Sequence, residues 1–490
     1  MLTLEAIKTY IDNDKGSDRK KKARIGQRYY DAEHDILKYK IMYLDKSKDE
    51  LVEDTTKANA RISHPFFTEL VDQEVQHMLS ETDSIFKSDD PDLQGMLDDY
   101  FNNSEQFMEE LYEALTDCIS KGFAYVYAYK TKEGKTGFQC ADSMGVIEVK
   151  AKETDDGCEY VIFWYVDHIG KDNKKITRVQ VWDEKQTWFY VQEENGQLQE
   201  DESEKVNPRP HVLYTKDGDG STYFENFGFI PFFRLDNCKK QKSGLWAIKG
   251  LIDDYDLMAC GLSNNIQDMA EAYIAVSGFD GDNLDELAVN WRAKKHIGVG
   301  DGGSIDIKTV DIPYQARQAK LELDEKNIYR FGMGFNAAQG SADMTDDEVQ
   351  SRYVLLDMKC NKLEIRLKSF LRRLLKVVLA EINAENGTDY QQKDVYFKFK
   401  RKTVTNQVND AQVKLSEAQK RQTEINTILT LREVIGDETM MELIAEQLDI
   451  DLDDLNAKRP KPEDEPTVYA QTIASGITAE DEVPEGDMSA

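Results

Sequence analysis

The sequence predicts a mixed α+β fold that is rich in helix, and two patterns support this prediction. Apolar residues recur at steps of three and four over several long segments, which is the spacing of one helix face. Residues 122–232 instead alternate with a period of two. The chain has 490 residues, of which 40% are apolar and 32% are charged. That length is sufficient for roughly two to four domains of a soluble protein.

The first half of the chain predicts helices followed by a sheet. Residues 1 to about 120 are expected to be mostly helical, with polar breaks at DKGSDRKKK and KSDDPDL. After them, the runs VIEV, EYVIFWYV, KITRVQVW and TWFYV are separated by turns such as TKEGKTG, ETDDG and GKDNKK. Short aromatic and β-branched runs between such turns predict an antiparallel meander.

Residues 244–276 return to the helical period and predict one helix of about 50 Å. Several acidic and amide side chains exclude a membrane span for it, so this helix needs protein neighbours along its length: Asp254, Asp256, Asn264, Asn265, Asp268 and Glu271.

The next segments are shorter. Residues 277–311 are expected to form a compact insert with a short helix and a β-hairpin. Pro313 then opens a second helix, with Asp311 placed to cap it. A glycine-punctuated loop follows, FGMGFNAAQGSADMTDDE, and beyond the next helix lie a strand at VYFKFKR and a helical region at 406–456. The proline-containing acidic tail after it is expected to be disordered.

The helix predicted at 347–384 has two distinct faces. Its apolar seam consists of Val349, Tyr353, Leu356, Cys360, Leu363, Leu367, Phe370, Leu374 and Val377. A second face is basic: Lys359, Lys362, Arg366, Arg373 and Lys376. The seam is expected to be core, although it could also pack against a partner copy. The basic face could form salt bridges with an acidic surface or contact DNA.

Composition and motifs exclude several function classes. Sixty-two basic against ninety-three acidic residues give a net charge of −31, which argues against a generic nucleic-acid coat. Six scattered cysteines without a CxxC pair predict reduced thiols, and neither a secreted nor a membrane-spanning product is expected. GVGDGG precedes a strand-like run rather than a helix, and DGDGST and DIDLDD lack the glycine of a calcium loop. With no P-loop, GxSxG elbow or HExxH motif, we predict no catalytic residue, metal or cofactor.

The order of elements and several motifs resemble the portal (head-to-tail connector) proteins of tailed bacteriophages. The branch is that of long-tailed phages of Gram-positive hosts. The resembling stretches are RYYDAEHDI (28–36), ANARISHPFFTELVDQEVQHMLS (58–80), GFAYVYAY (122–129), the run from GFIPFFRLDN to EAYIAVSGF (228–279) with its LIDDYD helix, and IYRFGMGFN (328–336). One departure is GSADMTDDEVQSRYVLL, which stands where the family often has a Ser-Gly-x-Ala-Leu stretch.

The resemblance implies a ring-forming portal fold with a defined division of the chain. The parts are an N-terminal arm and wing (1–243), a stem helix (244–276), a clip (277–311), a second stem helix (312–335), a tunnel loop (336–346), the wing's long helix and strand (347–405), a crown (406–456) and the tail (457–490). Such rings, usually of twelve subunits, occupy one capsid vertex of the virion after assembly in the host cytoplasm. Double-stranded DNA passes through them non-specifically.

The resemblance also implies partners and site residues. The partners are further copies of the chain, the terminase large subunit, a head-completion adaptor, and the major capsid and scaffolding proteins, with no membrane. The tunnel loop would present Asn336, Gln339, Ser341, Asp343 and Thr345. Candidate channel cations are Lys294, Lys295, Lys320, Lys326 and Arg330. Clip docking would involve Asp282, Asp285, Trp291 and Arg292.

Two other readings stay open at this stage. A helical scaffold or structural virion protein without a channel would share the long helices. A metal- or nucleotide-dependent enzyme would need a site that the motifs do not supply.

Overall fold

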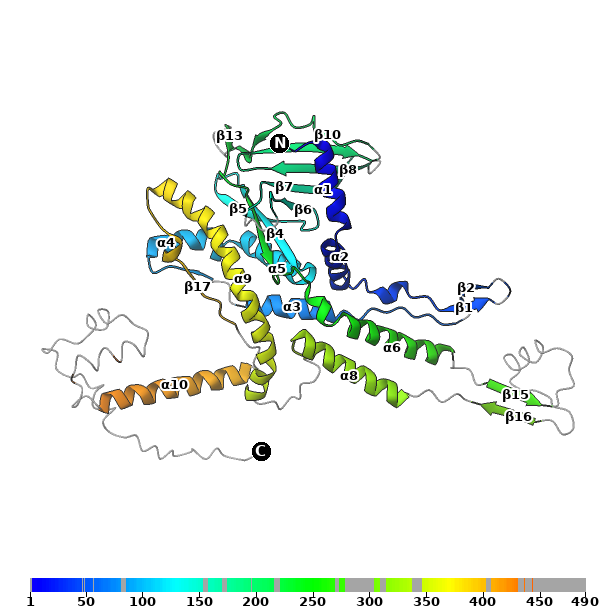
Figure 1. Ribbon diagram of the computed structural model, residues 1–490. Helices are drawn as coiled ribbons and strands as arrows, with labels where there is room; N and C mark the ends of the chain where they lie inside the picture. Colours follow the sequence, from blue (N-terminus) through cyan, green and yellow to red (C-terminus); the bar gives the residue numbers. More distant parts are fainter. Residues whose placement is uncertain are drawn as a thin grey trace, which may run out of the picture. The chain divides into compact units, whose positions relative to one another are not determined.

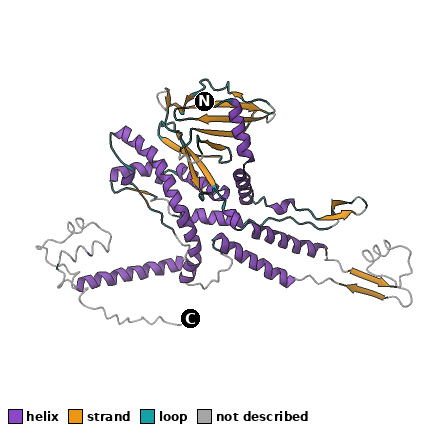
Figure 2. Cartoon of the chain, viewed as in Figure 1, coloured by secondary structure: helices purple, strands orange, loops and turns teal. Residues whose placement is uncertain are grey.

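The computed structural model describes most of the chain (Figures 1 and 2). The described residues are 2–45, 47, 49–55, 57–80, 85–152, 157–169, 174–194, 196–215, 221–268, 273–277, 304–308, 314–336, 346–401, 407–430, 436 and 443. The chain divides into two compact units, Met1–Thr403 and Val404–Ala490. The second unit contains α10 (Gln407–Thr430), within the region predicted to be helical.

The N-terminal region is helical, as predicted. Ser17 separates the first two helices because its side chain caps the second one, accepting the N–H of Lys20. The helices are α1 (Leu4–Gly16), α2 (Asp18–Tyr30), α3 (Phe66–Met78), α4 (Pro91–Leu97) and α5 (Glu105–Lys121). Between them lie η1 (Asp35–Lys38), the hairpin β1 (Met42–Asp45) with β2 (Glu50–Glu53), β3 (Phe86–Lys87) and η2 (Asp98–Asn102).

The predicted antiparallel meander is confirmed. Its strands run in the order β10-β9-β8-β7-β6: Gln199–Glu200, Gln186–Glu193, Lys174–Trp182, Tyr160–Ile169 and Val146–Val149, with β11 (Arg209–Pro210) beside β9. A second sheet has the order β14-β4-β5: Phe232–Asp236, Phe123–Lys130 and Thr136–Ala141. A separate hairpin joins β12 (Val212–Thr215) and β13 (Thr222–Glu225).

The long helix α9 (Asp346–Asn386) supplies much of the main core. Seven positions of the predicted seam, from Leu356 to Val377, are at most 8% exposed, and Tyr353 packs against the same cluster. The seam is therefore core, because its three-and-four spacing keeps every member on one side of the helix. Val349 lies among residues whose side chains are not described.

The predicted single helix over 244–276 is wrong. A 3-10 turn, η3 (Gly244–Ala247), precedes α6 (Lys249–Asp268), and residues 273–277 form the strand β15, paired with β16 (Ser304–Lys308). The run YIAVS fits either period, and pairing with β16 selects the strand. After α8 (Tyr314–Gly332), the predicted strand over 395–401 shortens to β17 (Tyr396–Phe397), which follows η5 (Gln392–Asp394) and pairs with β3.

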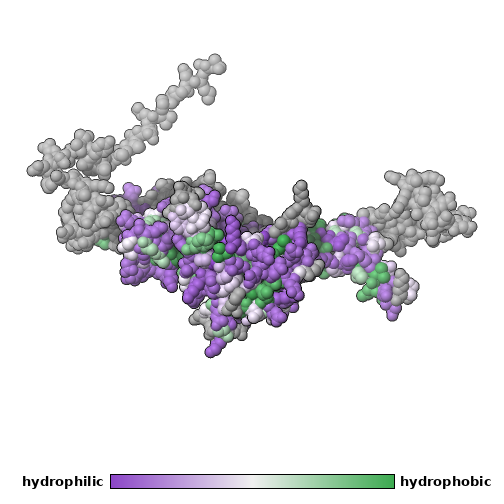
Figure 3. Space-filling model, turned by 90° about the horizontal axis from the view of Figure 1, so that it is seen from above, coloured by the Kyte–Doolittle hydropathy of each residue, from purple (hydrophilic) through white to green (hydrophobic). Residues whose placement is uncertain are grey.

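Several predictions fall outside the described residues. They include most of the insert 277–311, the cap at Asp311 and the tail 457–490. No helix in the described part of the chain combines the length and apolarity needed to cross a membrane. All six cysteines are free thiols. Most of the surface visible in Figure 3 is hydrophilic and is interrupted by apolar patches.

Candidate functional site: the stem and its anchorage

Helices α6 and α8 lie side by side and form a pair that we call the stem (Figure 1). Lys320 on α8 reaches Asp254 on α6 at 2.6 Å and also pairs with Asp324 of its own helix. The amide oxygen of Asn265 lies 2.6 and 2.9 Å from the guanidinium of Arg317 once the amide is oriented to accept. These polar contacts identify the side of α6 that packs against α8.

An extended segment, residues 58–64, runs along another side of α6 in the opposite direction; we call it the strap. Its alternate backbone N–H groups donate to side chains spaced four apart on the helix. The donor and acceptor atoms are 2.8 Å apart for Ala58 and Asp268, 2.6 Å for Ala60 and Asn264, 3.3 Å for Ile62 and the Cys260 sulfur, and 3.0 Å for His64 and Asp256. The strap thus satisfies its backbone without a neighbouring strand.

Asp256 is the last and most buried of these acceptors. It is 0% exposed, and its carboxylate lies 2.6 Å from Nδ1 of His34 and 2.7 Å from Nδ1 of His64. Burial opposes its ionisation, but the hydrogen bonds from both histidines outweigh burial and hold the pKa of Asp256 below its ordinary value. One carboxylate therefore joins α6 to two separate parts of the N-terminal region, at His34 and at His64.

A second polar cluster lies one turn earlier on α6. The Lys249 ammonium contacts Asp35 and Asp253, each at 2.7 Å, and the Tyr29 hydroxyl at 2.9 Å. Burial lowers the pKa of Lys249, but the hydrogen bonds that its ammonium donates to Asp253, Asp35 and Tyr29 outweigh burial, so the pKa is raised overall. Tyr29 also stacks on His34, with ring centroids 4.4 Å apart. The two clusters therefore form one anchorage at the base of the stem.

The opposite side of α8 is exposed and carries two cations. Lys326 and Arg330 are one turn apart, and neither makes an ion pair with any residue that the structure describes. Lys320 points the other way, into its pairs with Asp254 and Asp324. Lys326 and Arg330 therefore place unpaired positive charge on the exposed side of α8.

The family model for phage portal proteins of the SPP1 Gp6-like type matches residues 10–451, which is most of the chain. The chain belongs to the phage portal protein family.

Two phage portal proteins are similar to the chain in sequence. The chain is 26% identical to the portal protein of Bacillus phage SPP1 over 352 residues, covering 71% of this chain and 67% of that protein. It is 23% identical to the portal protein of Clostridium phage phiCD119 over 435 residues, covering 84% and 89%. The neck of the native GTA particle, computed with C12 symmetry, is similar with a TM-score of 0.40 and 12% identity over 78% of this chain and 89% of that chain.

The predicted family and host branch are therefore confirmed, as is the mixed, helix-rich fold class. A portal protein is a structural component of the head-to-tail vertex of the virion and not an enzyme. Three of the resembling motifs meet at the anchorage. RYYDAEHDI supplies His34, ANARISHP supplies the strap, and LIDDYD supplies Asp256.

The predicted site residues of the portal chain fall into two groups. Of the channel cations, the stem contains Lys320, Lys326 and Arg330, whereas Lys294 and Lys295 lie outside the described residues, as do all four clip positions. Of the tunnel-loop residues, only Asn336 is described; its amide donates to Glu325 at 2.8 Å. The other four, Gln339, Ser341, Asp343 and Thr345, lie outside the described part.

The basic face of α9 does not behave as one unit. Lys359 lies 2.9 Å from buried Glu74 on α3, and the Arg373 guanidinium donates to the backbone oxygen of Arg234. Lys362, Arg366 and Lys376 make no ion pair within the residues that the structure describes. Among the described residues, salt bridging to an acidic neighbour therefore accounts for Lys359 alone.

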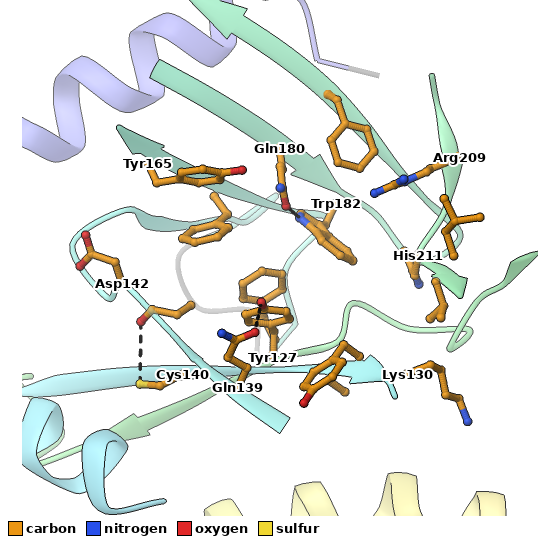
Figure 4. Close-up of a pocket in the computed structure, with 18 residues that line it drawn as sticks. Tyr127, Lys130, Gln139, Cys140, Asp142, Tyr165, Gln180, Trp182, Arg209 and His211 are labelled. Carbon is orange, nitrogen blue, oxygen red and sulfur yellow. Dashed lines mark hydrogen bonds between the residues drawn. The ribbon is translucent and has the colours of Figure 1, made fainter. Parts of the chain in front are cut away.

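A cavity of about 480 Å³ lies between the β10-β9-β8-β7-β6 sheet and the β14-β4-β5 sheet (Figure 4). Burial raises the pKa of the Cys140 thiol beside it. Burial also lowers the pKa of His211, whose Nε2 lies 2.7 Å from the backbone oxygen of Asp183. A protonated thiol and an engaged imidazole provide no activated nucleophile. Within the described residues, no group of three or more His, Cys, Asp or Glu side chains could hold a metal ion.

Sequence reasoning missed the strap and the anchorage. The signal that could have found them is the row Asp256, Cys260, Asn264 and Asp268, polar or sulfur-bearing at every fourth position of one helix. A helix side that packs against protein is usually apolar. A row of hydrogen-bond acceptors on such a side therefore indicates a packed segment whose backbone N–H groups need partners.

Proposed function

We propose that this portal protein is the repeating subunit of a closed ring of twelve copies at one capsid vertex. Double-stranded DNA is packaged through its channel by a separate terminase and later leaves by the same route. The observation that supports the proposal is the stem: α6 is covered by the strap on one side and by α8 on another, and the outer side of α8 is exposed and carries Lys326 and Arg330.

The charges of this side suit a duplex that must pass and not bind. Twelve copies would carry about −370 formal charges, so the ring as a whole repels phosphate. Lys326 and Arg330 would give each subunit two cations on the channel wall, enough for weak, salt-sensitive contacts with the DNA backbone. No base readout is needed, because transport is independent of sequence.

The remaining parts of the proposal concern partners. The clip (277–311) docks the terminase large subunit during packaging and the head-completion adaptor afterwards. The tunnel loop (336–346) projects into the channel, and the crown (406–456) faces the capsid interior. The major capsid and scaffolding proteins surround the vertex during assembly in the host cytoplasm.

Native mass spectrometry with negative-stain class averages of the purified chain tests the ring. We expect closed rings of about twelve copies with a central hole. A chain that stays monomeric across concentration and salt, and does so also with its scaffolding protein, would contradict the proposal.

A matched pair of variants then tests the channel wall. Lys326→Gln with Arg330→Gln should lower the retention of DNA by the ring at low salt while leaving the unfolding of the subunit unchanged, because both side chains are exposed and unpaired. Lys320→Gln should instead destabilise the subunit and leave DNA retention unchanged. It leaves the Asp324 carboxylate, which is 2% exposed, without its cation.

A further inference from the structure

An exposed apolar stripe lies on the side of α9 that faces away from the core. Val354, Met358 and Ile365 are 50%, 57% and 73% exposed, and their steps of four and seven align them on one side of the helix. Arg372 and Lys376 continue the same side, and Lys362 lies beside it; all three are exposed and make no ion pair with a described residue. This face of α9 is apolar at one half and basic at the other.

An open groove of about 570 Å³ lies along α3 and the residues just before it. Pro65 and Phe66 form its apolar part, and Glu69 and Asp72 make it acidic. Its walls are already fixed: the Phe66 ring packs edge-on against Tyr255 with centroids 4.8 Å apart, and Asp72 accepts from the Tyr30 hydroxyl at 3.0 Å. A preformed groove binds its occupant without first having to be ordered.

The stripe and the groove cannot meet within one chain. Glu74 of α3 contacts α9 through Lys359, and its backbone oxygen accepts from the Cys360 thiol, so this side of α3 faces α9. Glu69, Asp72 and Gln76 point about half a turn away from Glu74. The α9 stripe in turn points away from the seam that packs on α3. The two surfaces therefore lie on opposite sides of the α3–α9 pair.

We infer that the α3 groove of one copy receives the outer face of α9 from a second copy. The apolar stripe would cover Pro65 and Phe66, and the basic side chains of α9 would approach Glu69 and Asp72. Two different surfaces on opposite sides of a subunit generate a head-to-tail contact, which is the contact a closed ring repeats at every interface. The inference rests on the proposed ring and names the surfaces that build it.

A cysteine pair tests the contact directly in the full-length chain. Gln76→Cys marks the groove and Met358→Cys marks the stripe; both positions are exposed. With a short bismaleimide, the double variant should give a ladder of covalent multimers on a denaturing gel. Each single variant should give no more than the native cysteines give, and an equal mixture of the two single variants should give a covalent dimer only.

The outcomes separate the inference from the proposed ring. Closed rings by native mass spectrometry without a ladder would overturn the inference and leave the ring standing. Dimers from the Met358→Cys variant alone would overturn it as well, because they would mean that two α9 stripes face each other. Failure of the wild-type chain to associate at all would contradict both the α3–α9 contact and the proposed ring.

Charge variants at Gln76 supply an independent readout that leaves the fold intact, since its side chain is exposed. Gln76→Lys should raise the concentration for half-assembly by about threefold, and Gln76→Glu should not raise it. Adding Lys362→Glu to Gln76→Lys should restore assembly. Equal effects of the Lys and Glu variants would show that the basic face of α9 does not approach the groove.

Discussion

Replacement of Asp256 by alanine should weaken the attachment of α6 to the two N-terminal segments that contain His34 and His64. The carboxylate accepts three hydrogen bonds, from Nδ1 of His34 and from both Nδ1 and the backbone N–H of His64. Each buried donor left without a partner costs roughly 1–3 kcal/mol. Removing one side of a buried charged cluster costs about 3–5 kcal/mol in all, and we expect Asp256→Ala to fall in that range.

The neighbouring Asp254→Ala is the matched control. Its pair with Lys320 is about half exposed on both sides, so its loss should lower the free energy of unfolding by less than about 1 kcal/mol. Urea unfolding at pH 7 compares the two variants. Hydrogen exchange of the strap should increase for Asp256→Ala and stay unchanged for Asp254→Ala. Equal stability losses, or an unchanged exchange rate at His64, would refute the role given to Asp256.

The pH dependence follows from the depressed pKa of Asp256. A carboxyl whose folded-state pKa lies below its unfolded value of about 3.9 contributes stability that is complete above that value. This contribution is lost as the pH falls through the folded-state pKa. The stability difference between the wild type and Asp256→Ala should therefore be largest near neutral pH and shrink below about pH 4.

Two further predictions concern the fold. Leu367→Ala, in the buried seam of α9, should lower the free energy of unfolding by about 2–5 kcal/mol. Lys362→Ala, at an exposed position of the same helix, should change it by less than about 0.5 kcal/mol. Urea titrations that gave similar values for the two variants would contradict the assignment of the seam to the core. Gly122→Ala should destabilise the chain more than Gly228→Ala. Both have positive φ, but only at Gly122 would the new Cβ meet a backbone oxygen, that of Gln241 at 2.5 Å, and equal melting temperatures would count against this clash.

The elements that the sequence predicted well are those whose burial repeats at a fixed step. The α9 seam keeps apolar residues at steps of three and four for some twenty residues, and no other structure would bury all of them. The meander has the alternation and turn residues of antiparallel strands, and its strand order follows from short connections. In both cases the pattern and the packing have the same period.

The errors occurred where one stretch fits two periods or where contacts are polar. The run YIAVS at 273–277 continues the helical spacing of α6, yet it is also short and β-branched, and pairing with β16 decided its structure. The sequence predicts one basic surface on α9, but among the described residues only Lys359 of that face forms an ion pair, with Glu74 on α3. A pattern of charges in the sequence indicates which side of a helix is polar, but it does not identify the residues that contact that side.

The spacing of the strap contacts constrains how α6 can move relative to residues 58–64. Two residues of extended chain span about 6.6–6.8 Å, whereas four residues of helix rise only about 6.0 Å. The mismatch disappears if the strap follows the oblique ridge of the helix. At about 5 Å from the axis, the 40° turn between successive fourth residues adds a sideways arc of about 3.5 Å, so each step along the ridge is about 6.9 Å long. From Asp256 to Asp268 the strap must therefore wind through about a third of a turn around α6. A shift of α6 along its own axis therefore keeps the acceptor side chains in register with the strap only if the helix also rotates, by about 40° for each step of four residues.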